Sequence, residues 1–202
     1  MKKYSALTLI EMMMAIAILI IGMAGISLLF SKTWKTNSYT LKMGQSALSV
    51  SQGLSKMVDY VRRVRQGDDG AYPVQLADDN EFIVYGDYDK DGITEKLHFY
   101  KSGQNVLMGV TEPTNTLPKT YPSGDQETMT IVSHIVNDSS TPIFYYFDEN
   151  YPADQVNNPA VTPALAGNVR LVKIYFEINI DPGHAPNNVE MQSFVEMRNL
   201  GD

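Results

Sequence analysis

The pattern of apolar residues predicts a membrane-spanning helix near the start of the chain. From Met12 to Ser31 there are twenty consecutive uncharged residues, most of them apolar. As a helix, this stretch is about 30 Å long, which matches the hydrocarbon core of a bilayer. We therefore expect residues 7–31 to form a transmembrane helix.

The helical pattern continues beyond this stretch but becomes amphipathic. No proline occurs between residues 41 and 65, and apolar residues recur three or four positions apart, which places them on one face of a helix: Val50, Leu54, Met57, Val61 and Val64. Gly67 and Gly70 supply a stop signal. We expect an amphipathic continuation over residues 32–67, in which residues 32–44 are either exposed helix or a local break.

From residue 71 onward the period of the pattern changes to two, which indicates β-strands. The sequence therefore predicts an α+β fold, in which the long N-terminal helix packs on the antiparallel β-sheet of a head formed by residues 71–202. Strands are predicted at residues 81–85, 94–100, 128–136, 143–147, 170–180 and 189–198. Long surface loops, rich in Pro, Asn, Asp and Thr, are predicted at residues 109–127 and 148–168.

The strand at residues 170–180 has the most regular pattern. Apolar residues occupy every second position and define a buried face: Val172, Ile174, Phe176, Ile178 and Ile180. The aromatic run at residues 144–147 could stack bases or sugars, but a half-buried strand explains it equally well and is the commoner arrangement.

A single acid lies at the start of the apolar stretch. Glu11 is the only charged residue between residues 4 and 31. A carboxylate inside a bilayer costs on the order of 2.5 to 3.5 kcal/mol, so it is usually paired and usually functional. The nearest cations, Lys2 and Lys3, lie two or more helical turns upstream, too far for a side-chain contact. The positive partner of Glu11 must therefore come from elsewhere.

The residues around Glu11 resemble the cleavage and methylation segment of type IV pilins and of type II secretion pseudopilins. A short basic leader, residues 1–6, precedes residues 7–11 and the apolar stretch. The resemblance implies that a prepilin peptidase cleaves between Ala6 and Leu7 and methylates the new amine of Leu7. It also implies that Glu11 pairs with the N-terminal amine of a neighbouring subunit. Ala6 and Leu7 replace the family's usual Gly and Phe, but they keep a small residue before the cut and a large apolar one after it.

The same resemblance implies a structural protein and not an enzyme. The expected protein is a larger minor pilin or minor pseudopilin, held by a single span in the bacterial inner membrane with its head outside the cytoplasm. It would then be built into a pilus or periplasmic pseudopilus, near the filament tip, where it primes assembly or contacts partners. The implied partners are the inner membrane, the prepilin peptidase and other subunits of the same filament. A plain signal anchor or a cleaved signal peptide would explain the apolar stretch, but neither gives Glu11 a role.

Composition narrows the classes of function. The net charge of −7 argues against binding to nucleic acid or to an anionic membrane surface, and the only dense basic group is Arg62, Arg63 and Arg65. Cysteine is absent, so no disulfide staples the head and no thiol nucleophile exists. No nucleophile elbow, P-loop or dinucleotide fingerprint occurs. The three histidines are scattered without ligand spacing, which argues against zinc.

One segment of the head is a candidate calcium site. Residues 87–95 resemble the first half of an oxygen-ligand calcium loop, with acids at alternate positions and Gly92 at the sharp turn. The predicted ligands are Asp87, Asp89, Asp91, the carbonyl of Ile93, and Glu95. The bidentate acid expected at the last loop position is absent, because that residue is His98.

Two questions about this segment stay open at the level of sequence. An acid from Asp78, Asp79 or Glu81 would have to complete the coordination of calcium. Alternatively, the segment is only a hairpin turn, since Asp and Gly adopt turn conformations without an ion. If calcium binds, the chain could be a membrane-tethered, calcium-dependent binding module or adhesin that acts without filament assembly.

Overall fold

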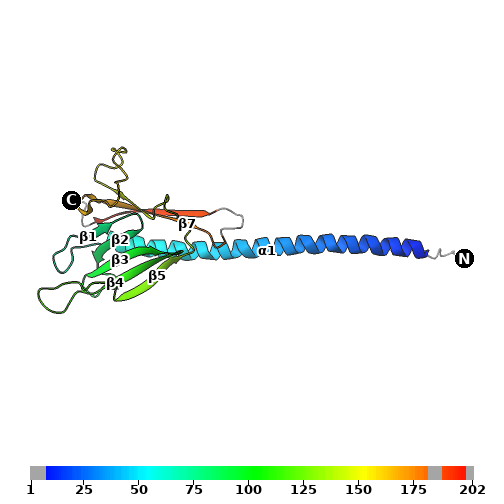
Figure 1. The fold of residues 1–202 in the computed structure, drawn as a ribbon, viewed down its shortest axis with the longest axis horizontal. Coiled ribbons are helices and arrows are strands. Elements are labelled where there is room, and N and C mark those ends of the chain that lie inside the picture. Colours follow the sequence, from blue (N-terminus) through cyan, green and yellow to red (C-terminus); the bar gives the residue numbers. More distant parts are fainter. Residues whose placement is uncertain (1–7, 182–187, 199–202) are drawn as a thin grey trace. The chain divides into compact units, whose positions relative to one another are not determined.

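The computed structural model describes residues 8–181 and 188–198 (Figure 1). Its contacts divide the chain into two units, one ending at Gly44 and the other beginning at Gln45. One helix, α1 (Leu9–Arg62), contributes to both units.

The first unit consists of the N-terminal part of α1. Residues 9–31 are helical, and their side chains are exposed throughout. Residues 32–44 are also helical, which decides against a local break. By length and composition, α1 is the one helix among the described residues that could cross a membrane.

Helix α1 ends at Arg62, five residues before the predicted end of the amphipathic segment at residue 67. The amides of Arg63 and Val64 donate to carbonyls three residues back, at 3.1 and 3.4 Å, which tightens the last turn. The amide of Arg65 then donates to the carbonyl of Tyr85 at 2.9 Å. The helix therefore stops where its backbone begins to bond to the sheet, and not at the glycines.

The larger sheet of the head has five antiparallel strands in the order of the sequence. They are β1 (Val74–Ala77), β2 (Glu81–Gly86), β3 (Glu95–Ser102), β4 (Asn105–Thr111) and β5 (Glu127–Ser133). The predicted hairpin is confirmed as β2 and β3, with Gly86 opposite Glu95. Strands β1 and β4 were not predicted, and β4 extends into the segment predicted as a loop from residue 109.

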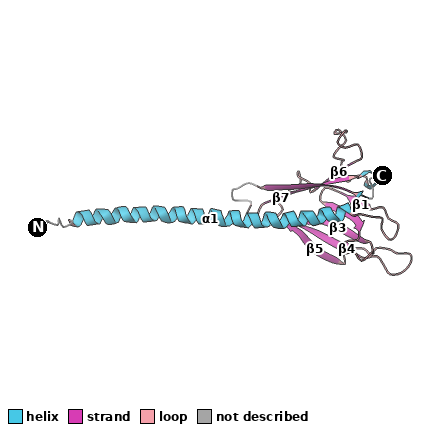
Figure 2. Cartoon of the chain, turned by 180° about the vertical axis from the view of Figure 1, so that it is seen from behind, coloured by secondary structure: helices cyan, strands magenta, loops and turns pink. Residues whose placement is uncertain are grey.

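A second sheet has three antiparallel strands, β6 (Phe144–Phe147), β7 (Leu171–Ile178) and β8 (Val189–Glu196), with β7 in the centre. The expectation of one sheet is therefore corrected to two. An isolated antiparallel bridge joins Ile135, just after β5, to Ile178 at the end of β7. Both views draw β7 above the last part of α1 and β3 to β5 below it (Figure 2).

The long loops and the aromatic strand follow the prediction closely. Residues 148–168 contain no strand and only the short 3₁₀ turn η1 (Ala166–Asn168). The aromatic run forms β6, with three of its four side chains buried. On β7 the apolar face is buried as far as Ile178, but Asn179 is buried next and Ile180 is only half-buried. The alternation thus ends with the strand.

The core of the head lies between the two sheets and residues 45–62 of α1. All five residues predicted on one face of the helix are buried: Val50, Leu54, Met57, Val61 and Val64. Phe82 from the larger sheet packs against Phe144 and Tyr146 from the smaller one, each with ring centroids 5.4 Å apart. At Gly53 a Cβ atom would lie 2.4 Å from the carbonyl oxygen of Ile131, so only glycine allows the helix to approach β5 this closely.

Candidate assembly and metal sites

Glu11 lies in the first turn of α1 and bonds to Thr8 just before it. The amide and the hydroxyl of Thr8 both donate to Oε2 of Glu11 at 2.8 Å. The Glu11 amide points back to the Thr8 hydroxyl oxygen at 3.4 Å. This is the reciprocal arrangement of a capping box, in which a Thr and a Glu three residues later satisfy the free donors of a helix start.

The capping box leaves part of the Glu11 carboxylate available. Among the described residues, no hydrogen bond reaches Oε1. The carboxylate is also stabilised by the positive end of the helix dipole, since it lies in the first turn. The Thr-x-x-Glu spacing was visible in the sequence, but the role of Thr8 was not predicted. Ala6 and Leu7, the predicted cleavage residues, lie outside the described residues.

Three of the five predicted calcium ligands come together. Carboxylate oxygens of Asp87, Asp89 and Glu95 all lie within 4.8 Å of one another. Asp91 is not part of this group: its Oδ1 accepts a hydrogen bond from the amide of Ile93 at 2.7 Å. Such a cluster of oxygens suits a hard divalent cation, although exposed acidic groups also occur without one.

A guanidinium group from the segment just after α1 contacts the same loop. Arg65 donates to the carbonyls of Gly92 and Ile93 at 2.9 and 2.5 Å and to the hydroxyl of Thr94 at 2.8 Å. It also lies 3.6 Å from a carboxylate oxygen of Asp87. Arg65 therefore bonds to the Ile93 carbonyl that the sequence assigned to calcium. The spacing of 28 residues between Arg65 and Ile93 gave no local signal of this contact.

The acids expected to complete the coordination lie elsewhere. Asp78, Asp79 and Glu81 belong to the β1–β2 turn and the start of β2, whereas the Asp-rich loop follows the other end of β2. Oε1 of Glu81 instead lies 3.0 Å from Nε2 of His98. The structure therefore does not bring any of these three acids to the loop.

The comparison with protein families concerns the N-terminal segment. A family model described as the prokaryotic N-terminal methylation motif matches residues 1–27. The chain carries a pilin-type N-terminus. The match includes Glu11 and supports the type IV pilin and pseudopilin family that the sequence predicted. No curated protein matches the chain.

A pilin-type N-terminus points to a processed structural subunit associated with the membrane and with other pilin subunits. The exposed apolar helix of residues 9–31 fits this interpretation, because it provides one membrane anchor near the N-terminus. The motif points away from an enzyme, but it covers only the N-terminal segment and does not describe the head.

In the head, the pKa of Glu95 departs clearly from its ordinary value. Its side chain is buried, and burial raises its pKa from 4.5 to about 7. The amide of Tyr88 donates to Oε2 at 3.1 Å and opposes this shift, while the charges of Asp89 and Asp91 add to it. Without a cation, Glu95 therefore exchanges a proton near neutral pH.

We expect Glu95→Gln to change how stability depends on pH in calcium-free buffer. Because the folded-state pKa is raised, the contribution of Glu95 is fully present below pH 4.5 and is lost as the pH rises through about 7. Glutamine cannot ionise, so between pH 4.5 and 8 the variant should gain about 2 to 3 kcal/mol over the parent. Urea unfolding at several pH values measures this difference. Parallel pH curves for the two proteins would contradict it.

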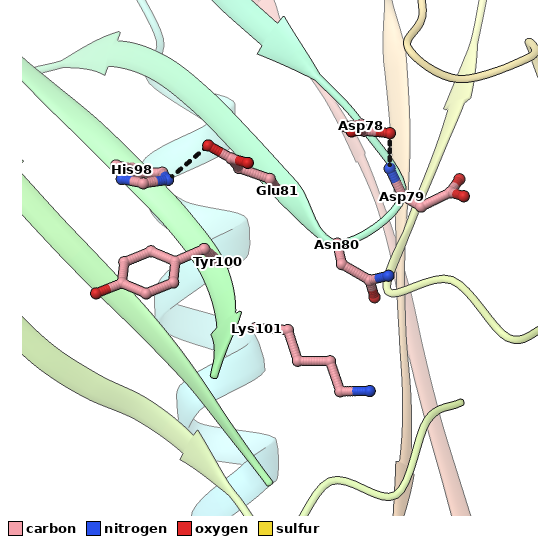
Figure 3. Close-up of a pocket in the computed structure, with 7 residues that line it drawn as sticks. All are labelled: Asp78, Asp79, Asn80, Glu81, His98, Tyr100 and Lys101. Carbon is pink, nitrogen blue, oxygen red and sulfur yellow. Dashed lines mark hydrogen bonds and ion pairs between the residues drawn. The ribbon is translucent and has the colours of Figure 1, made fainter. Parts of the chain in front are cut away.

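A polar pocket of about 440 Å³ lies at the opposite end of β2 (Figure 3). Three of the seven residues that line it are acids: Asp78, Asp79, Asn80, Glu81, His98, Tyr100 and Lys101. His98 lies between two carboxylates, with Nδ1 3.1 Å from Asp125 and Nε2 3.0 Å from Glu81. Only the imidazolium form donates from both nitrogens. The sequence gave no sign of this arrangement, since the acids are 17 and 27 residues away.

Proposed function

We propose that this chain is a minor subunit of a type IV pilus-like or type II secretion filament. In this proposal it is inserted in the inner membrane with its head outside the cytoplasm. A prepilin peptidase cleaves it between Ala6 and Leu7, and it is then incorporated near the filament tip, where it primes assembly or contacts partners. The observation that carries the proposal is the methylation motif at residues 1–27, which coincides with the start of the exposed apolar helix.

The exposed apolar surface of the helix suits a protein that moves from the membrane into a filament during assembly. Residues 9–31 are exposed throughout the described chain, and water would disfavour such a surface. A bilayer covers it before assembly, and the helices of neighbouring subunits cover it within a filament. In both settings polar side chains among apolar helices are costly unless they are paired, so they determine which packing is stable.

Glu11 supplies such a polar determinant. Thr8 holds Oε2 through two hydrogen bonds, which fixes the carboxylate at the start of the helix. Oε1 is then oriented to accept a hydrogen bond from the N-terminal amine of an adjoining subunit. Because an unpaired buried charge is strongly penalised, this contact would set the axial register between helices.

Cleavage of the leader tests the proposal directly. We expect mass spectrometry of the full chain, extracted from membranes of cells that express a prepilin peptidase, to show the loss of residues 1–6 and the gain of one methyl group. Ala6→Glu should retain the leader, since a bulky charged residue then precedes the cut. Retention of the leader on the unmodified chain, in cells that process sister subunits, would overturn the proposal.

A second candidate is a membrane-tethered binding module that uses calcium and acts without filament assembly. The specific observation in its favour is the cluster of carboxylates from Asp87, Asp89 and Glu95. Arg65 argues against tight binding, because its guanidinium already bonds to the loop carbonyls. A calcium site is also compatible with a filament subunit. Calcium binding therefore distinguishes the two candidate functions only in combination with the effect of replacing Glu11.

We expect calcium to bind this loop weakly, with a dissociation constant of about 10⁻⁴ to 10⁻³ M, as in extracellular modules with few charged ligands. Calorimetric titration of the full chain in non-ionic detergent measures it. Asp89→Asn should abolish the heat, because it removes a clustered carboxylate. The matched control Asp91→Asn should retain it, because Asp91 lies outside the cluster. No binding at millimolar calcium would eliminate the site.

A further inference from the structure

Five cationic side chains from three separate segments meet at one end of the head. They line a pocket of about 370 Å³ together with one acid: Arg62, Arg63, Arg65, Lys90, Arg198 and Asp87. The arginines come from the end of α1 and the residues after it, the lysine from the β2–β3 loop, and Arg198 from beyond β8. In a chain of net charge −7, such a concentration of positive charge is not explained by composition. We call this group the basic cluster.

Two members of the basic cluster are already paired within the chain. Arg63 lies 3.3 Å from Asp59, and Arg65 is bonded to the Asp-rich loop. In the described part of the chain, no ion pair involves Arg62, Lys90 or Arg198, and the last two are exposed. Among the described residues, these three side chains are thus the cations of the cluster that can pair with an external anion.

The acids next to Lys90 do not neutralise this surface fully. Asp89 and Asp91 flank Lys90 in the sequence but do not line the pocket. Each directs one carboxylate oxygen to a backbone amide of its own loop, at 3.2 and 2.7 Å. Within the pocket itself five cations thus face a single acid, Asp87, while the two flanking carboxylates keep their charge outside it.

The opposite charge gathers at the other end of the same strand. The acidic pocket of Figure 3 lies at the start of β2, where Asp78, Asp79 and Glu81 line it. Its one lysine, Lys101, donates to the backbone carbonyl of Asn137. At a rise of about 3.4 Å per residue, β2 separates the two charged surfaces by about 17 Å. The two surfaces of opposite charge thus lie near the two ends of β2.

We propose that the basic cluster of one copy of this chain docks on the acidic pocket of a second copy. The two surfaces differ, so the contact is heterologous: one copy contributes the basic cluster and its neighbour the acidic pocket. This inference rests on the proposed function only for its place in a filament. The contact itself needs just two adjacent copies and is compatible with a minor subunit.

Disulfide cross-linking between introduced cysteines can test this contact, because the chain contains no cysteine of its own. Full chains carrying Lys90→Cys or Glu81→Cys, with different tags, are mixed in non-ionic detergent and oxidised. We expect disulfide-linked dimers that contain both tags. The control pairs Lys90→Cys with Val156→Cys, a position that is 94% exposed and lies outside both surfaces. The control should give at least fivefold less mixed dimer.

Salt and charge reversal distinguish docking from random collision. Raising the salt to about 1 M shortens the screening length to about 3 Å and should reduce the mixed dimer several-fold. Arg62→Glu together with Arg198→Glu, placed in the chain carrying Lys90→Cys, should have the same effect at low salt. Mixed dimer no higher than the control, or insensitive to both changes, would overturn the inference. That result would also be obtained if the basic cluster instead meets an acidic surface of a different subunit.

Failure of this inference and failure of the proposed function give different results. A cleaved, methylated chain without the cross-link overturns the docking contact alone. A cross-link in a chain whose leader is never removed overturns the filament function and leaves the contact between copies.

Discussion

Glu11→Ala is expected to abolish incorporation of the chain into filaments while leaving its insertion into the membrane intact. In the proposed assembly the substitution leaves the amine of the adjoining subunit without a partner among apolar helices. Loss of one member of a buried ion pair typically costs about 3 to 5 kcal/mol, which corresponds to a decrease in incorporation of more than about 100-fold. Immunoblots of sheared filaments and of the membrane fraction measure the two quantities separately.

Two further variants show whether the charge itself is responsible. Glu11→Gln keeps the shape of the side chain but removes its charge, so it should behave like Glu11→Ala. Thr8→Val removes the hydroxyl that holds Oε2 and should reduce incorporation less. Lys56→Ala, at an exposed position of α1, is the matched control and should leave both insertion and incorporation unchanged. If all four variants are incorporated like the parent, the tethered binding module becomes the better account.

Phe82→Ala is expected to destabilise the head by about 3 to 5 kcal/mol. Phe82 is fully buried and lies against Phe144 and Tyr146, so truncation leaves a cavity where the two sheets meet. Urea unfolding of the full chain in detergent, followed by far-UV circular dichroism, gives the change in free energy of unfolding.

Phe194→Ala is the matched control for this measurement. Phe194 is 45% exposed and lies on β8 with its ring 5.9 Å from that of Phe147. Its truncation should cost about 1 kcal/mol or less, because it removes little buried surface. Equal losses from the two variants would show that the contact between the sheets is not the main source of stability in the head.

Prediction from sequence succeeded where a local pattern carries the information. The period of 3.6 identified five apolar residues from Val50 to Val64 that are all buried, the last of them just after α1, because a helix places such residues on one face. The period of two identified β2, β3 and β7 for the corresponding reason. The short strand β1 was missed because four residues are too few to show a period.

At the candidate sites, too, only the features that depend on a local pattern were predicted from the sequence. The Asp-rich loop was visible because its acids alternate within nine residues, and three of them converge in the structure. The contact of Arg65 with this loop was not visible. This contact depends on α1 ending beside β2, and no pattern in the sequence indicates that these two elements lie next to each other.

The sequence by itself determined the apolar helix, the acid at its start and the methylation motif, because each is a pattern of neighbouring residues. Only the tertiary structure decided that the head has two sheets, that His98 lies between Glu81 and Asp125, and that Arg198 joins the arginines after α1. These contacts join residues far apart in the chain, whose positions are set by the packing of whole elements around a common core. Local periodicity reports which face of an element is buried, but it does not report which other element will cover that face.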